Sequence, residues 1–193
     1  HGKLISIEGG EGAGKTTVLQ AVRDCLAQTG KTVICTREPG GTDVGEEIRR
    51  VLLTPGRTLD AGTELLLMFA SRAQLVNALI KPALARGDYI VTDRFTDASF
   101  AYQGGGRGIE ASDIRALETR FVGIQPDLTL LLDLSVDQGM ARAQSRGQSL
   151  DRIESERHDF FLNVRAAYLC RAAEDPQRIK VIDASQTAES VVR

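Results

Sequence analysis

The stretch Gly9-Gly10-Glu11-Gly12-Ala13-Gly14-Lys15-Thr16-Thr17 decides the fold of this chain. It follows an apolar run at 4–8 and opens a helical pattern at 17–29, so the sequence predicts a strand, a glycine-rich turn and a helix. Glycines allow backbone N–H groups to turn inward around an anion, and the start of the following helix adds a partial positive charge. The stretch therefore predicts a phosphate-binding loop.

The spacing of the loop matches the motif G-x4-G-K-[ST] in the strand-loop-helix setting that the motif requires. We expect Lys15 to reach the β- and γ-phosphates of ATP and the hydroxyl of Thr16 to hold Mg²⁺. The predicted ATP contacts are Gly9, Gly10, Glu11, Gly12, Ala13, Gly14, Lys15, Thr16, Thr17 and, beyond the loop, Arg142. An accidental glycine turn is the alternative. The motif alone does not separate a kinase from a GTPase, a switch or a motor.

Four further apolar runs, at 32–36, 89–93, 128–133 and 179–182, predict strands that alternate with helices. Helical patterns cover 63–86 and 112–122, and further helices are expected after Ser135 and from about 153 to 174. This alternation favours a three-layer α/β P-loop NTPase fold, with a five-stranded parallel sheet between helices. We expect 193 residues to form a single domain, with further C-terminal residues to complete a last helix.

The composition excludes several classes of partner. A formal net charge of −2 and a pI near 5.8 provide no basic surface for nucleic acid or anionic membranes. No apolar run approaches the ~20 residues that a membrane-spanning helix needs, and no secretory leader is visible. The three cysteines match no zinc or redox spacing. We expect a cytoplasmic protein that binds neither nucleic acid nor membranes.

Charged residues follow the second and third predicted strands and would lie beside the loop if those strands are its neighbours. Arg37 and Arg94 could each form paired hydrogen bonds to an acceptor phosphate. Asp93 ends an apolar strand and is placed to hold Mg²⁺ or to orient the attacking oxygen. A surface ion pair is the alternative for either arginine. The pattern favours a phosphotransferase with a small acceptor.

On the helical pattern at 63–86, Arg72 lies four residues after Met68 and three after Phe69. A flat apolar group beside a guanidinium suits a nucleobase. The alternative is that Met68 and Phe69 are ordinary core residues.

An arginine-rich stretch at about 142–154 predicts a mobile lid. It contains Arg142, Arg146 and Arg152 around Gly147. An arginine that contacts the transferring phosphoryl group accelerates phosphoryl transfer by roughly 10³-fold or more, and closure of a lid excludes water. A solvated turn between two helices is the alternative.

Taken together, these stretches resemble the bacterial thymidylate kinase family over nearly the whole chain. The matching segments are 9–16, 37–42, Phe69 with Arg72, Asp93-Arg94-Phe95, Ala101-Tyr102-Gln103-Gly104 and Asp151-Arg152-Ile153-Glu154. The resemblance implies transfer of the γ-phosphoryl group of ATP to dTMP, with Mg²⁺, by a protein that usually forms a homodimer. The substrate contacts that it implies are Glu11, Arg37, Glu38, Pro39, Arg49, Phe69, Arg72, Arg94, Ser99, Tyr102 and Gln103.

The resemblance also implies individual roles. Glu11 would approach the sugar 3′-hydroxyl, and Tyr102 would crowd the 2′ position and reject ribose. The acceptor phosphate would lie among Arg37, Arg49 and Arg94. The thymine edge would be read by Arg72, Ser99 and Gln103.

Two positions depart from the family pattern. The eukaryotic branch carries an arginine at the position of Gly12, so here the catalytic arginine would come from the lid, with Arg146 and Arg152 preferred to Arg142. Many bacterial relatives carry the stacking aromatic where this chain has Met68, which makes Phe69 the expected ring. The catalytic set is thus Lys15, Asp93, Arg94, Arg146 and Arg152, with Thr16 and Asp93 at the metal.

Two other functions remain open at this point. The chain could be a kinase for another nucleoside monophosphate or for a deoxynucleoside. It could also be an ATP-gated switch that has no acceptor. The face of the predicted helix at 65–76 could pack against a second copy or against the sheet.

Overall fold

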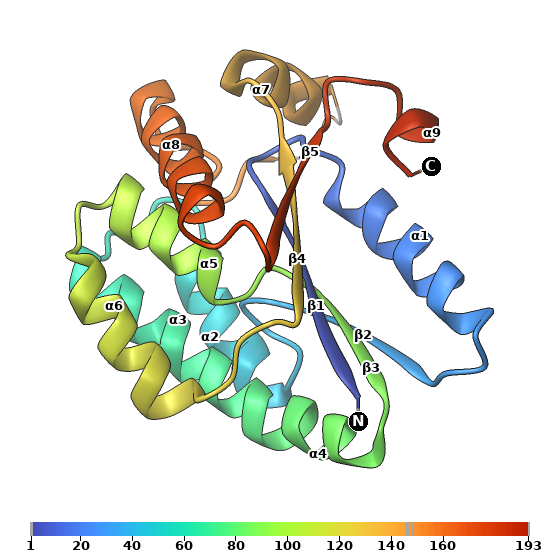
Figure 1. The fold of residues 1–193 in the computed structure, drawn as a ribbon. Coiled ribbons are helices and arrows are strands. Elements are labelled where there is room, and N and C mark those ends of the chain that lie inside the picture. Colours follow the sequence, from blue (N-terminus) through green and yellow to red (C-terminus); the bar gives the residue numbers. More distant parts are fainter. Residues whose placement is uncertain (1, 146, 148, 193) are drawn as a thin grey trace.

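The computed structural model describes residues 2–145, 147 and 149–192. Its five strands form one parallel sheet in the order β2-β3-β1-β4-β5 (Figure 1). Each predicted strand is confirmed to within one residue at either end. The strands are β1 (Lys3–Gly9), β2 (Val33–Arg37), β3 (Tyr89–Asp93), β4 (Leu128–Asp133) and β5 (Ile179–Asp183).

Helices cover both faces of the sheet, as the alternating pattern predicts. One face carries α1 (Lys15–Ala27) and the short α9 (Ala188–Val191), whereas the larger helical layer lies against the other face (Figure 1). α7 (Val136–Ser145) lies at the end of the sheet where β4 ends. The larger layer contains α2 (Asp43–Leu53), α3 (Ala61–Leu75), η1 (Val76–Ile80), α4 (Lys81–Arg86), α5 (Thr96–Ser99), η2 (Phe100–Gly106), α6 (Ala111–Leu117), η3 (Glu118–Val122) and α8 (His158–Glu174).

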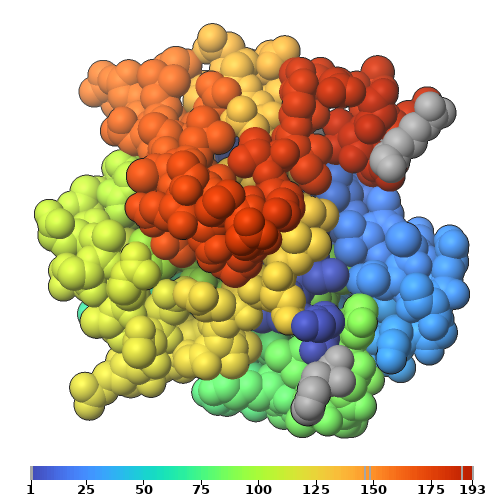
Figure 2. Space-filling view, in the orientation of Figure 1, coloured from blue at the N-terminus to red at the C-terminus, as the bar shows by residue number. Residues whose placement is uncertain are grey.

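The two faces of β1 have different chemistry because side chains alternate along a strand. Ile5 and Ile7 pack on the α1 side. On the other side Leu4 joins the core of the larger layer, whereas Ser6 and Glu8 are polar and fully buried. Figure 2 shows α8 and the loop after it, in orange to red, covering the β5 side of the sheet. Buried polar residues therefore lie under the larger helical layer.

The helical pattern at 63–86 is confirmed, and α3, η1 and α4 follow one another without a break up to Gly87, which has a φ of 90°. Another expected helix differs from the sequence prediction. The helix expected from about 153 begins only at His158. The reason is Asp151, whose carboxylate accepts the backbone N–H groups of Ile153 and Glu154 and holds a turn instead.

The sheet order determines where the functional loops meet. β3 lies between β1 and β2, and Asp93 pairs in register with Ile7 on one side and Arg37 on the other. The loops that follow these three strands therefore share one edge of the sheet, which is where ligands bind in open parallel sheets. Among the described residues, none of the helices is long and apolar enough to cross a bilayer.

Candidate active site

The glycine-rich loop has a backbone shape that only glycine allows at one of its positions. Gly12 has a φ of 70°, and a Cβ atom there would lie 2.2 Å from the carbonyl oxygen of Gly139 on α7. Lys15 lies across the loop, and its Nζ donates to the carbonyl oxygens of Gly9 at 3.3 Å and Gly10 at 3.0 Å. Burial, together with the charge of Arg94, lowers the pKa of Lys15. The loop has the form of an anion cradle.

A large cavity, the main cavity, joins this loop to the ends of β2 and β3. Its volume is about 1380 Å³ including its open mouth. Seven loop residues line it together with the charged residues that the sequence predicts after both strands. The lining consists of 11–17, 37–39, Arg49, Leu53, Met68, Asp93, Arg94, Arg142, Asp151, Ile153 and Glu154.

Arg94 has an unusual backbone at the centre of this cavity. Its φ is 72°, a region that a residue with a Cβ atom rarely adopts. Its guanidinium donates to Glu11 at 2.6 Å and to the hydroxyl of Tyr102 at 2.9 Å, while its Nε is buried without a partner among the described residues. Arg94 therefore lines the cavity in an orientation fixed by Glu11 and Tyr102.

Glu11 and Tyr102 complete a small polar triangle with Arg94. The Tyr102 hydroxyl donates to Glu11 at 3.1 Å, and the guanidinium carbon lies 4.7 Å from the centre of the Tyr102 ring. Burial opposes ionisation of Glu11, but the positive charges of Arg94 and Lys15 lower its pKa to about 2. Glu11 is therefore a carboxylate at neutral pH and accepts hydrogen bonds.

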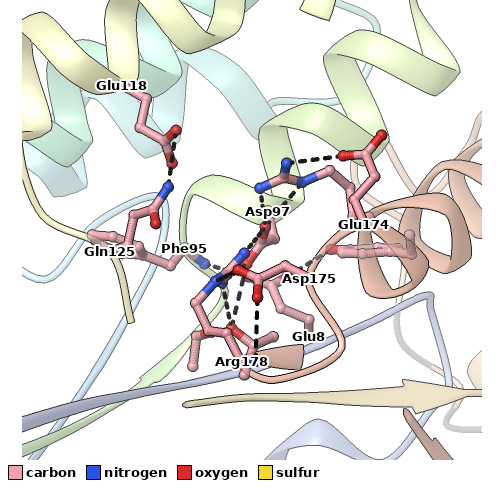
Figure 3. A network of polar contacts seen from close by, with 12 residues as sticks. Glu8, Phe95, Asp97, Glu118, Gln125, Glu174, Asp175 and Arg178 are labelled. Carbon is pink, nitrogen blue, oxygen red and sulfur yellow. Dashed lines mark hydrogen bonds and ion pairs between the residues drawn. The ribbon is translucent and has the colours of Figure 1, made fainter. Parts of the chain in front are cut away.

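Glu8 supports the turn that contains Arg94, and the sequence patterns do not predict this role. It is fully buried and accepts the backbone N–H of Phe95 and the hydroxyl of Tyr168, both at 2.7 Å (Figure 3). Burial and the charge of Asp97 raise its pKa to about 8. The bond to Phe95 fixes the turn that contains Arg94. The sequence signal that could have indicated this role is a glutamate within the otherwise apolar run at 4–8.

Asp97 anchors the segment after that turn to α8 and to the strand that follows. It is 1% exposed and accepts hydrogen bonds from Arg171 at 2.9 Å and Arg178 at 2.6 Å (Figure 3). Burial opposes its ionisation, but Arg178 and Arg171 lower the pKa of Asp97 below its ordinary value. The network makes the Arg94 turn part of a rigid framework.

Two further arginines bring positive charge to the β2 side of the main cavity. Arg37 pairs with Glu46 at 3.0 Å, and Arg49 donates to the carbonyl oxygen of Pro39 at 2.8 Å. Burial and the neighbouring charge of Arg37 lower the pKa of Arg49. With Arg94 they give this side of the cavity three guanidinium groups, which favours a bound anion.

A smaller inner pocket of about 290 Å³ continues from the main cavity, and the two share Glu38, Pro39, Met68, Arg94 and Ile153. Arg72, Ser99, Tyr102 and Gln103 also line it, as the sequence analysis expects of residues that would contact a base and a sugar.

Arg72 is held firmly at the inner pocket. It is 2% exposed and donates to Glu38 at 2.6 Å, Ser99 at 2.9 Å and the carbonyl oxygen of Phe95 at 3.1 Å. These bonds use three of the five N–H groups that a guanidinium carries. The orientation of Arg72 is therefore fixed before any ligand binds.

Phe69 does not line the inner pocket, which corrects the expectation that it is the stacking ring. It is 3% exposed, lies in the core with Leu4 and Leu65, and its ring centre is 4.6 Å from the guanidinium carbon of Arg72. Met68 lines the pocket instead. Both residues lie within one turn of Arg72, but Phe69 packs into the core, which leaves Met68 at the pocket.

Arg152 also differs from its expected place. It is 8% exposed, and it donates to Glu64 at 2.7 Å and to the carbonyl oxygen of Leu52 at 2.6 Å. It lines neither cavity. The expectation of a catalytic lid arginine is therefore wrong for Arg152 in this structure, because a buried carboxylate binds it on the side of α3.

Of the other two arginines in the predicted lid, the structure places Arg142 at the main cavity. Arg146 lies outside the described residues. Arg142 lines the main cavity beside the loop and donates to the carbonyl oxygen of Ala184 at 2.9 Å. It also lines a hollow of about 660 Å³ between the start of α1 and residues 184–192.

Asp93 has the strongest features of a metal ligand in the main cavity. It ends β3, and its Oδ1 is buried without a hydrogen-bond partner among the described residues. Thr16 lines the same cavity from the loop. The described residues contain no cluster of three or more His, Cys, Asp or Glu side chains that could hold a metal. A cation here would need phosphate and water oxygens to complete its ligands.

Comparisons with known proteins agree with this geometry. The family model described as thymidylate kinase matches residues 7–193. A thymidylate kinase of Nitrosospira multiformis is 51% identical over 194 residues, covering 100% of this chain and 94% of that protein. One from Chromohalobacter salexigens is 53% identical over 193 residues, covering 98% and 91%.

A solved structure gives the same result. The crystal structure of thymidylate kinase from Ehrlichia chaffeensis superposes with a TM-score of 0.79 at 31% identity, covering 94% of this chain and 92% of that one. The chain therefore belongs to the thymidylate kinase family of phosphotransferases.

Proposed function

We propose that ATP binds on the loop at 9–17, that dTMP binds in the inner pocket, and that the two phosphate groups meet in the main cavity. The observation that carries this assignment is the continuity of the two cavities, which share Arg94 and four other lining residues. A nucleotide with its base in the inner pocket would direct its 5′-phosphate toward the loop.

Phosphoryl transfer then needs positioning and positive charge more than covalent chemistry. An oxygen of the dTMP phosphate attacks the γ-phosphorus, and the bond from this phosphorus to the bridging oxygen of ADP breaks. Arg37, Arg49 and Arg94 would hold the acceptor phosphate, while Lys15 balances the charge that develops on the β- and γ-phosphates. The products are dTDP and ADP.

Mg²⁺ fits the residues that face this reaction. The hydroxyl of Thr16 and the unpartnered Oδ1 of Asp93 would hold the ion, directly or through water. When bound, the ion neutralises phosphate charge. Asp93 lies at the end of a rigid strand, so it would hold its oxygen in place without reorganisation.

The sugar and base have defined partners under this assignment. Glu11 would accept a hydrogen bond from the 3′-hydroxyl, and the Tyr102 ring would limit the space at the 2′ position. The free N–H groups of Arg72 would face the O4 atom of thymine. Ser99 positions Arg72 through the hydrogen bond between them.

The lid would supply the remaining positive charge. With Arg152 bound to Glu64, the sequence leaves Arg146 as the candidate for the catalytic lid arginine, and Arg142 would contact ATP from α7. Removing Arg146 should then lower kcat more than it raises the KM for dTMP.

We also propose that the protein acts in the cytoplasm as a homodimer. Leu66 on α3 is 60% exposed and lines a shallow apolar hollow with Leu65, Ile109 and Leu117. An exposed apolar surface on a helix suits a second copy of the same face. The three cysteines are free, as is usual in a reducing compartment. Light scattering after size exclusion tests the dimer, and a monomer would contradict it.

A coupled assay of ADP release with Mg-ATP tests the proposed acceptor. It compares no acceptor, dTMP, dUMP, dCMP, dGMP, AMP and thymidine at equal concentration. We expect the rate to rise by orders of magnitude with dTMP and far less with the others. Preference for thymidine would indicate a nucleoside kinase, and a slow rate with every acceptor would indicate an ATP-gated switch.

A further inference from the structure

Glu64 on α3 is a buried carboxylate that the phosphate chemistry does not use. It is 1% exposed and accepts hydrogen bonds from Gln103 at 2.8 Å, Arg107 at 3.0 Å and Arg152 at 2.7 Å. Arg107 also pairs with Glu156 at 2.6 Å, so two carboxylates balance two guanidinium groups. Such a cluster is costly to build in a protein interior unless every member has partners.

The ionisation of Glu64 restricts the orientation of Gln103. Burial opposes ionisation, but the hydrogen bonds from Arg107, Gln103 and Arg152 lower the pKa of Glu64 below its ordinary value. An ionised carboxylate only accepts hydrogen bonds, whereas a carboxamide has a donating end and an accepting end. Gln103 must therefore turn its Nε2 toward Glu64, because the opposite orientation would place two acceptors together.

The same restriction sets what Gln103 offers to the inner pocket. Gln103 is 1% exposed and lines this pocket beside Arg72. With Nε2 bound to Glu64, the Oε1 atom is the free end of the carboxamide, and no hydrogen bond reaches it from the described part of the chain. The pocket thus combines an acceptor at Gln103 with donors at Arg72.

This combination distinguishes the two kinds of pyrimidine. Thymine and uracil carry an O4 acceptor next to an N3–H donor, whereas cytosine carries an amino donor next to an N3 lone pair. An acceptor at Gln103 matches N3–H and opposes the lone pair of cytosine. If the carboxamide were free to turn over, its N–H would match cytosine instead.

We propose that Glu64 is a specificity-determining positioning residue, which holds the Gln103 carboxamide with its oxygen toward the base and thereby favours dTMP over dCMP. The inference rests on the proposed assignment of the inner pocket to the base of dTMP. Glu64 lines neither the main cavity nor the inner pocket. It acts through Gln103 alone.

The first test is E64Q, which keeps the shape of the side chain. It removes the negative charge and replaces a group that only accepts hydrogen bonds by one that can also donate. We expect the ratio of kcat/KM for dTMP to that for dCMP to fall by about tenfold, because the carboxamide of Gln103 can then turn over. The ratio of dTMP to dUMP should stay unchanged, since both bases present N3–H and O4. E156Q, the matched control, removes the outer carboxylate and should leave both ratios at wild-type values.

A purely structural role for Glu64 predicts a different outcome. In that case E64Q would lower thermal stability, or would lower kcat/KM for dTMP, dCMP and dUMP by the same factor. The dTMP to dCMP ratio would stay unchanged. That result would overturn the proposal.

The double variant E64Q/Q103E tests the same idea with the charge of the cluster preserved. The new amide at position 64 donates to the new carboxylate at position 103, which again presents an acceptor to the base. We expect the dTMP to dCMP ratio to return toward the wild-type value. A folded double variant with a low ratio would overturn the proposal, and this comparison holds even if E64Q alone does not fold.

Q103L separates failure of this inference from failure of the base assignment. Its dTMP to dCMP ratio should fall because the carboxamide is absent. If Q103L keeps the wild-type ratio, the base lies elsewhere and the assignment of the inner pocket fails together with the inference. If Q103L lowers the ratio and E64Q does not, only the role of Glu64 is overturned.

Discussion

The two halves of the site are built in different ways. The donor half consists of one continuous segment, residues 9–17, whose backbone forms the cradle and whose Lys15 lies across it. The proposed acceptor half gathers side chains from β2, α3, β3 and η2, and some of them, such as Arg72 with Glu38, are held by a buried partner. A backbone cradle binds any polyphosphate, whereas converging side chains select one acceptor. Generic binding can therefore be encoded locally, and selectivity requires the assembled fold.

The largest expected effect breaks the donor half. Lys15→Ala should lower kcat by at least about a thousandfold, because the charge beside the transferring phosphoryl group is lost. The fold should persist, since the hydrogen bonds of the Lys15 ammonium within the described residues go to the carbonyl oxygens of Gly9 and Gly10 and hold no distant segment. Steady-state kinetics and a thermal melt measure the two quantities. The exposed Lys31→Ala is the matched control, and wild-type turnover in Lys15→Ala would refute the role of Lys15.

The next largest effect is expected for a substitution that disrupts the acceptor half and preserves its positive charge. Arg94→Lys should reduce kcat/KM for dTMP by about a hundredfold, because a lysine cannot form the paired bonds of a guanidinium. It also loses the geometry that joins Arg94 to Glu11 and Tyr102. Kinetics with dTMP varied at saturating ATP measure the loss. The exposed Arg23→Lys should show no change, and an equal loss in both variants would contradict the assignment.

A third variant concerns stability. Arg152→Ala should lower the free energy of unfolding by about 3 kcal/mol, because it leaves the buried charge of Glu64 with one fewer partner. Arg165→Ala breaks a partly exposed pair with Asp133 and should cost less than about 1 kcal/mol. Urea denaturation measures both variants. A fall in kcat without loss of stability in Arg152→Ala would restore the sequence-based assignment of this residue to phosphoryl transfer.

The smallest expected effect on activity concerns Glu8. Burial raises its pKa in the folded state to about 8, so folding favours its protonated form. The stability that Glu8 contributes is fully present below its ordinary pKa of 4.5 and is lost as pH rises to about 8. Glu8→Gln keeps the shape and stays neutral, so it should flatten this decline and change kcat little at pH 7. Urea denaturation at pH 5 and pH 8 tests the difference; an unchanged slope would contradict it.

The sequence predicted the sheet and the donor half because both are local patterns. The apolar runs give β1 to β5, and the spacing from Gly9 to Thr16 defines the loop. The place of Arg37 and Arg94 beside the loop was predicted on the condition that their strands are neighbours of β1. The structure meets this condition because β3 lies between β1 and β2, and both arginines line the main cavity.

The remaining features depend on contacts between distant segments. Nothing in the local pattern shows that Phe69 belongs to the core while Met68 faces the pocket, since both lie within one turn of Arg72. The sequence around Arg152 is typical of a lid arginine, but its partner in the structure is Glu64, which lies 88 positions earlier in the chain. Buried ion pairs of this kind carry no periodic signal, so they emerge only when the helices are packed.

The close approach of Gly12 and Gly139 limits how this enzyme could change its catalytic design. A Cβ atom on Gly139 would lie 2.4 Å from the carbonyl oxygen of Glu11, just as one on Gly12 would meet Gly139. An arginine at position 12, as in the eukaryotic branch, would have to displace α7 and also adopt a left-handed backbone. A side chain at position 12 therefore requires a compensating change on α7. The spacing of these two backbones keeps the loop free of side chains at this point.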